Sequence, residues 1–193
     1  MPESGPIDAG TYQTKTFHPQ LTYTVPAGWG NFEDLPGNFL LVLPGAPLSG
    51  VNPGTSDYLG VYTSVVAPGH CNSQASTTVP PTFDGLAGFL TSNPGISASN
   101  VHNVTVGRLK GVVMDLAFKG KGDGCPDGMW ADIYVGRSPS SLSHSVIPDV
   151  NARIYLLHNG ADTLAIELQD GVDGNCKDWF GAAAKVIETF KFH

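Results

Sequence analysis

The sequence predicts an α+β fold, with a single antiparallel β-sheet and two main helices packed on it. The 193 residues include 24 Gly and 15 Pro, a composition that favours short strands joined by many turns. Most segments with two-residue hydrophobic alternation come in neighbouring pairs, as in antiparallel hairpins. Only two segments, 82–92 and 176–188, have the spacing of an amphipathic helix.

The length suits one domain with a full hydrophobic core. Residues 1–9 are expected to form a flexible N-terminal tail, and residues 10–193 a single α+β domain. The first part of the domain is predicted to hold four strands, at 10–17, 21–25, 38–44 and 57–66. Leu21, Tyr23 and Val25 share the apolar face of the second strand. Pro26 ends this strand because it cannot donate to a sheet ladder, and Trp29 is expected to fold back over the core.

The central helix has both a start and a stop signal. Thr82 is the predicted N-cap, and the residues Asn93, Pro94 and Gly95 end the helix. Four residues form its apolar face at i, i+3, i+4 and i+7: Phe83, Leu86, Ala87 and Leu90. A hairpin follows, with its turn at Gly107–Arg108.

A second hairpin covers residues 152–168 and can be built in two registers. A two-residue turn at Asn159–Gly160 leaves Leu164 and Ile166 on the face opposite to Ile154 and Leu156. A three-residue loop with a bulge at Gly160 brings these four side chains together, and we predict it because register follows the buried face. The helix over 176–188 and a short strand at 190–192 complete the domain.

Charge and hydropathy restrict the partners. The net charge is −7, and the ten Lys and Arg residues are scattered, which argues against nucleic acid. No apolar run approaches the roughly 20 residues that span a bilayer, so membrane insertion is not expected. The start, MPESGPIDAG, lacks the features of a signal peptide. The Ser-, Thr- and Asn-rich composition nevertheless favours an extracellular or cell-surface domain whose leader is absent, and a cytosolic protein is the alternative. We expect a monomer.

No catalytic motif is present: the sequence contains no GxSxG, no HExxH and no Walker loop. We therefore expect no catalytic residues, no metal and no cofactor. Asp170 and Asp173 lie in a Gly-rich loop that does not match the EF-hand spacing. An enzyme stays open as an alternative, with a carboxylate site near Asp115, which lies in the middle of a predicted strand.

The candidate ligand-binding residues are Trp130, Asp132 and Tyr134, which alternate along one face of the strand 129–136. Aromatic rings beside an acid on an exposed sheet face suit sugar or peptide binding, although the same face suits packing beneath a helix. The sequence thus predicts a non-enzymatic binding or accessory domain for an unknown small molecule, glycan or protein. A structural interaction domain of a larger surface protein is a further alternative.

Several fragments resemble a family of exported bacterial domains of unknown function. They are IDAGTYQTKTFHPQLTYTVPAGW, FDGLAGFLTSNPGISASNVHNVTVGRLKGVVMDLAF, NARIYLLHNGADTLAIEL and AAAKVIETFKF, which together cover most of the chain. The layout is similar to the PsbP-like α/β/α fold, named for a subunit of the photosystem oxygen-evolving complex. The resemblance brings no invariant catalytic motif with it.

The resemblance also implies a disulfide. In the exported relatives one cysteine precedes the central helix and a second follows the long hairpin, and Cys71 and Cys125 match these positions. Cys176 has no counterpart. From the residues alone, all three cysteines lie in Gly- or Asp-rich loops, and a Cys125–Cys176 bond stays open as the rival pairing.

Overall fold

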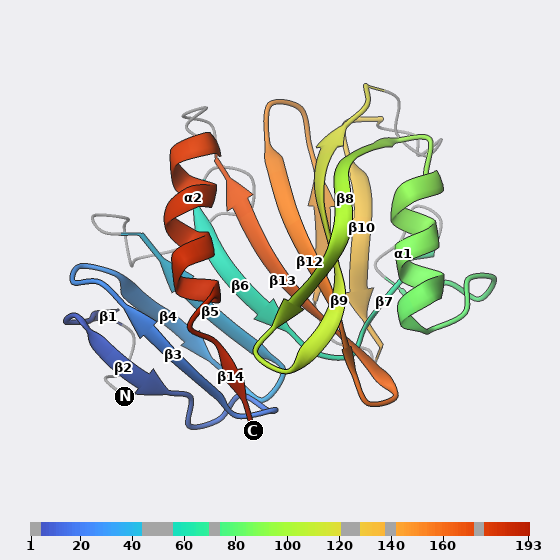
Figure 1. Cartoon of the computed structure of the whole chain (residues 1–193). Helices are drawn as coiled ribbons and strands as arrows, with labels where there is room; N and C mark the ends of the chain where they lie inside the picture. Colours follow the sequence, from blue (N-terminus) through green and yellow to red (C-terminus); the bar gives the residue numbers. More distant parts are fainter. Residues whose placement is uncertain (1–4, 44–55, 70–73, 121–127, 138–141, 172–175) are drawn as a thin grey trace.

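Three antiparallel β-sheets and two helices make up the computed structural model (Figure 1). It describes residues 5–43, 56–69, 74–120, 128–137, 142–171 and 176–193. Of the segment 1–9, predicted to be a flexible tail, residues 5–9 are described. Gly5 and Pro6 pair with Asn31 and Gly30, and Ile7 is buried.

The largest sheet has eight strands, and every neighbouring pair is antiparallel. In spatial order these are β1 (Gly5–Pro6), β4 (Gly30–Asp34), β5 (Asn38–Val42), β6 (Tyr58–Tyr62), β13 (Asp162–Asp170), β12 (Asn151–Asn159), β9 (Leu109–Phe118) and β8 (Ile96–Val106). The central pair, β6 and β13, joins segments that are about a hundred residues apart in the sequence.

Each face of the main sheet is covered by one helix and one small sheet. On one face lie α2 (Cys176–Ile187) and a sheet of β14 (Lys191–Phe192), β3 (Leu21–Val25) and β2 (Gly10–Gln13). On the other lie α1 (Phe83–Ser92) and a sheet of β11 (Ser143–Val146), β10 (Ala131–Gly136) and β7 (Val65–Val66).

The predicted single sheet with two packed helices is therefore wrong: the chain is mostly β, with three sheets and two helices in its described part. The physical reason is the area to be covered. Helices of 10 and 12 residues are only about 15–18 Å long and cannot cover both faces of an eight-stranded sheet. Strands that we assigned to one sheet instead form the two small covering sheets.

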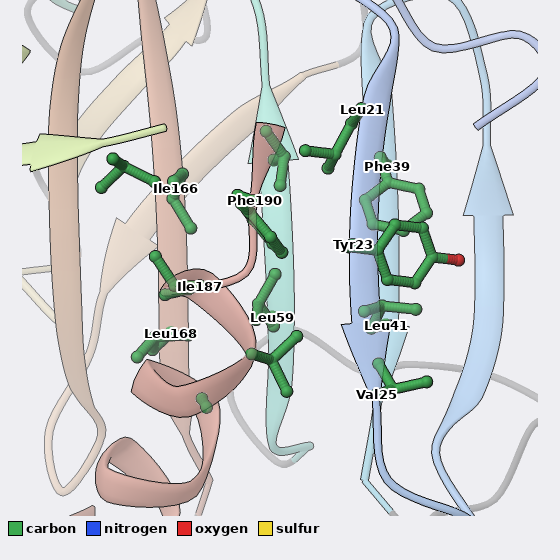
Figure 2. Close-up of a cluster of buried hydrophobic side chains, with 14 of the residues drawn as sticks. Leu21, Tyr23, Val25, Phe39, Leu41, Leu59, Ile166, Leu168, Ile187 and Phe190 are labelled. Atoms are coloured by element: carbon green, nitrogen blue, oxygen red, sulfur yellow. The ribbon is translucent and has the colours of Figure 1, made fainter. Parts of the chain in front are cut away.

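The first core lies beneath α2 and the β2–β3–β14 sheet, and Figure 2 shows its centre. Leu21, Tyr23 and Val25 point into it from β3, as predicted, and the rings of Tyr23 and Phe39 lie 4.9 Å apart. Trp29 is 3% exposed and packs on Trp179, with ring centroids 5.5 Å apart. The predicted role of Trp29 in covering the core is confirmed.

The second core lies between the main sheet, α1 and the β7–β10–β11 sheet. Leu86 and Leu90 of α1 are fully buried in it. The Thr82 hydroxyl accepts a hydrogen bond from the Gly85 amide at 3.1 Å, so the predicted N-cap is confirmed. The hairpin turn at Gly107 is also confirmed: β8 ends at Val106, β9 begins at Leu109, and Gly107 has φ +58°.

The predicted register of the second hairpin is wrong. Asn159 pairs with Asp162, so the turn is Gly160–Ala161 and the ladder continues without a bulge. Ile154 and Leu156 point into the second core, whereas Leu164 and Ile166 point into the first. Our prediction assumed that only one face of the hairpin is buried, but both faces of the main sheet are covered.

Gly111 in β9 is expected to tolerate no side chain. A Cβ atom at this position would lie 1.8 Å from the backbone oxygen of Leu156, so neighbouring strands would have to separate. We expect G111A to lower the free energy of unfolding by about 2–3 kcal/mol in urea denaturation. G88A is the control, because Gly88 in α1 has open space around it, and it should stabilise by about 0.5–1 kcal/mol. A neutral G111A would show that the sheet adapts at this position.

Candidate functional site

The predicted ligand-binding residues lie on or beside β10 and do not share one face. The register of β10 against β11 shifts between Asp132 and Tyr134, so the alternation is broken at this bulge. Asp132 is 6% exposed and accepts a hydrogen bond from the Ser145 hydroxyl at 2.6 Å. Tyr134 is fully buried in the second core, and Trp130 is half-buried. A ligand-binding role for these three residues stays a prediction.

The Tyr134 side chain belongs to a buried polar cluster around Glu167 of β13. The hydroxyls of Tyr58 and Tyr134 both donate to the Glu167 carboxylate, the first at 2.9 Å. Nδ1 of His144, on β11, forms an ion pair with Glu167 at 2.7 Å. The His144 ring also stacks on Tyr134, with centroids 4.9 Å apart, and packs against Tyr62 at 4.5 Å.

The electrostatics of the cluster follow from its burial. Burial alone would raise the pKa of the Glu167 carboxyl, but the His144 charge and three hydrogen bonds outweigh it and hold this pKa below its ordinary value. Burial and the nearby Glu167 charge raise the pKa values of Tyr58, Tyr62 and Tyr134 well above that of a free tyrosine. Burial also raises the pKa of Glu33 on β4, and the charge of His144 acts in the opposite direction.

This cluster joins the β7–β10–β11 sheet to the main sheet. Glu167 and Tyr58 come from the main sheet, and Tyr134 and His144 come from the small one. The carboxylate already accepts from three donors of the chain, and Glu167 is 1% exposed. We therefore interpret the cluster as an internal polar connection rather than as a ligand site.

The surface next to α2 is different, because the main sheet extends beyond the helix and leaves a groove over β8, β9 and β12. The groove encloses a cavity of about 440 Å³. Its lining residues are Ser97, Ser99, Asp115, Leu116, Ala117, Asn151, Arg153, Phe180 and Gly181. Two ladder rows form the floor, because Ser97, Ala117 and Asn151 are paired in one row and Ser99, Asp115 and Arg153 in the next.

An ion pair lies at the centre of the groove. Arg153 donates to both oxygens of Asp115, from Nε at 2.6 Å and from a terminal nitrogen at 2.9 Å, and the Asn100 amide donates to the same carboxylate at 2.7 Å. The guanidinium also lies 4.9 Å from the centre of the Phe180 ring. Partial burial alone would raise the pKa of Asp115, but these hydrogen bonds and the Arg153 charge hold it below its ordinary value.

Three polar side chains of the groove are available to a ligand. Ser97, Ser99 and Asn151 are exposed, and within the described ranges their side chains have no hydrogen-bond partner. Gly181 adds space, because a Cβ atom there would meet nothing within 4 Å. Asp115 was the only groove residue that the sequence singled out; the serines and Asn151 gave no signal, since their pairing depends on strand register.

A second cavity of about 420 Å³ opens on the opposite face of the same strands. Its walls include Asn103, Thr105 and the rings of Phe83 and His158, whose centroids lie 3.8 Å apart. Among the described residues, no group of three or more His, Cys, Asp or Glu residues is arranged to hold a metal ion. Within the described ranges, no helix is long and apolar enough to cross a membrane.

The predicted disulfide cannot be placed, because Cys71 and Cys125 lie outside the described residues. Cys176 is the first residue of α2. Of the Asp170–Asp173 loop, Asp170 is described and is fully buried at the end of β13, whereas Asp173 lies outside the described ranges.

Comparison with known proteins gives similarities of fold only. No protein-family model and no curated protein matches the sequence. Solved structures that match include a Bacteroides thetaiotaomicron protein, with 13% identity and a TM-score of 0.43 over 90% of this chain. The chain spans only 45% of the length of that protein.

Two further matches extend over nearly the whole of both chains. The cyanobacterial PsbP (CyanoP) of Synechocystis sp. PCC 6803 has 10% identity and a TM-score of 0.42, covering 97% of this chain and 94% of its own. LpqN, involved in cell envelope biogenesis of Mycobacterium tuberculosis, has 13% identity and a TM-score of 0.45, covering 98% and 90%. The predicted resemblance to PsbP-like proteins is confirmed, and at these scores the matches assign no function.

Replacing Glu167 tests the polar cluster. Glu167→Gln preserves volume but removes the charge opposite His144, and we expect a loss of about 3–5 kcal/mol in the free energy of unfolding at pH 7. Because the folded-state pKa of Glu167 lies below the unfolded value of about 4.3, its charge stabilises the fold above that pH. The difference between wild type and variant should therefore shrink as the pH falls below about 4 in a series of urea titrations.

The control is Asp162→Asn, which removes the carboxylate of another ion pair, at 2.7 Å from Arg137, in which both side chains are 39% exposed. We expect this surface pair to contribute at most about 1 kcal/mol. Equal effects of the two substitutions would contradict the role of Glu167 as a buried connection.

Proposed function

We propose that the chain is an exported, non-enzymatic binding domain whose ligand lies in the groove over β8, β9 and β12. The observation that carries the proposal is the cavity of about 440 Å³, in which exposed, unpartnered side chains surround a fixed ion pair. This volume lies at the lower end of the range for small-molecule sites, and the groove combines apolar surface at Ala117, Phe180 and Gly181 with a few polar groups, as such sites do.

The state of Asp115 supports binding rather than acid–base catalysis. A general acid or base works best with a pKa near the operating pH, which for a carboxyl group means a raised pKa. Asp115 has a lowered pKa and is held by Arg153 and Asn100. In a binding site, the Asp115 carboxylate would fix the orientation of the Arg153 guanidinium on the floor of the groove.

Composition supports the proposed export. Only 14% of the residues are charged, and all three cysteines lie in Gly- or Asp-rich loops, which suits a disulfide in an oxidising compartment. We propose an extracellular or cell-surface location, a Cys71–Cys125 bond and a monomeric state.

Peptide mapping under non-reducing conditions tests the disulfide. We expect a peptide pair that contains Cys71 and Cys125, with Cys176 as a free thiol, because this pairing matches the cysteine positions of the exported relatives. A Cys125–Cys176 pair would contradict this assignment. Three free thiols in oxidatively prepared protein would contradict both the disulfide and the argument for export that rests on it.

A substitution that fills the groove tests the binding function. In Gly181→Trp the indole should occupy the open space beside Arg153 and exclude the ligand without clashing with the fold. A thermal-shift screen should use neutral oligosaccharides, trigalacturonate, dipeptides and fatty acids, and a ligand of the native state raises the melting temperature. We expect at least one compound to stabilise the wild type and to lose this effect in the variant.

Gly88→Trp is the matched control, because Gly88 is also an exposed helix glycine with nothing within 4 Å of its Cβ position. It lies on α1, over the opposite face of the main sheet. Near-UV circular dichroism of both variants checks that they fold. Compounds that stabilise the wild type and G181W equally would contradict a binding site in the groove.

A further inference from the structure

We propose that the ligand of the groove is a short, neutral saccharide, an inference that rests on the proposed function and names its ligand class. Among the described residues that line it, the groove offers hydroxyl and amide groups in two rows, a small apolar area at Ala117 and Gly181, and an ion pair whose charges compensate each other. Each of these three features restricts the chemistry of the ligand.

The charge balance excludes ions as the preferred ligands. Of the described residues that line the groove, only Asp115 and Arg153 are charged, and they neutralise each other through a bidentate pair. An anion would have to compete with Asp115 for the guanidinium, and a cation would have to compete with Arg153 for the carboxylate. The net charge of −7 further disfavours anions. A neutral molecule leaves this pair intact.

The available polar groups suit a ligand with many hydroxyls. Ser97, Ser99 and Asn151 can each both donate and accept hydrogen bonds. Residues in the same row of an antiparallel ladder lie about 5 Å apart, and rows on one face are about 7 Å apart. Polar groups on such a grid can reach several hydroxyls of one or two sugar rings at once.

The apolar part of the groove suits the C–H face of a sugar ring. Ala117 lies on the floor between Ser97 and Asn151, and Gly181 of α2 borders the groove without a side chain. Phe180 of α2 is 4% exposed and lies against the Arg153 guanidinium, so it forms part of the groove wall on the helix side. A flat strip of small residues, bordered by hydroxyls and next to a mutually compensated ion pair, matches a pyranose better than a bulky apolar side chain.

Binding of defined saccharides tests this inference. The probes are maltotriose, cellotriose, mannotriose and chitotriose, with trigalacturonate as the charged counterpart, titrated by calorimetry and followed by the backbone amide shifts of residues 97–99, 115–117 and 151–153. We expect at least one neutral trisaccharide to bind with an affinity that is the same in 0.05 and 0.5 M NaCl, because no ion pair forms.

Two double variants of the same strand locate the site. S97A/S99A should weaken binding about 25-fold, at about fivefold for each lost hydrogen bond. N103A/T105A should leave it unchanged, because Asn103 and Thr105 are also exposed on β8 but line the cavity on the opposite face. Both pairs are exposed, so neither variant should unfold the protein.

The outcomes separate this inference from the proposed function. If only a charged or peptide compound binds and G181W blocks it, the saccharide class is wrong while the binding function stands. A saccharide that responds to N103A/T105A instead of S97A/S99A would place its site in the other cavity and overturn the inference. If G181W blocks none of the compounds, the saccharide class and the binding function both fail.

Discussion

The rest of the structure depends on the burial of β13 on both faces. β13 lies in the middle of the main sheet between β6 and β12, and every side chain from Thr163 to Asp170 is buried. One face needs the first core, under α2 and β3, and the other needs the second core, under α1 and β10. Two cover layers are therefore obligatory. Glu167 points into the second core, and because its carboxylate is buried there, its charge must be compensated by a residue inside the protein.

The same constraint explains how much of the fold the sequence predicts. The helices at 82–92 and 176–188 are predicted closely, since caps and a four-residue period are local signals. The hairpin of β12 and β13 is found, but its register is wrong, because the rule that gathers apolar residues on one face holds only for a sheet with one open face. The two-residue strands β7 and β14 give almost no alternation, so the small sheets could not be separated from the main one.

The candidate site is less predictable, because its pairs are distant in the sequence. Asp115 stands out as an acid within an apolar strand, but its partner Arg153 lies 38 residues further on. Glu167 resembles the solvent-facing position of an alternating strand and is in fact enclosed by Tyr58, Tyr134 and His144. Tyr134 was selected with Asp132 by strict alternation, which the bulge in β10 breaks. Bulges and ladder registers follow from tertiary packing, and one sequence does not show them.

Two of the carboxylate–cation pairs among the described residues, Glu167–His144 and Asp115–Arg153, show why the proposed ligand site lies beside one pair and not beside the other. Glu167 and His144 lie under the small sheet, and the tyrosine hydroxyls occupy the space and the acceptor sites around them. Asp115 and Arg153 lie where α2 is too short to cover β9 and β8, so the pair is 22% and 28% exposed beside open volume. Because Arg153 is paired with Asp115 and stacked on Phe180, its charge is already compensated at the surface. The groups that remain available to a ligand are therefore uncharged hydrogen-bonding side chains, and hydrogen bonding by neutral groups is the main property of the groove.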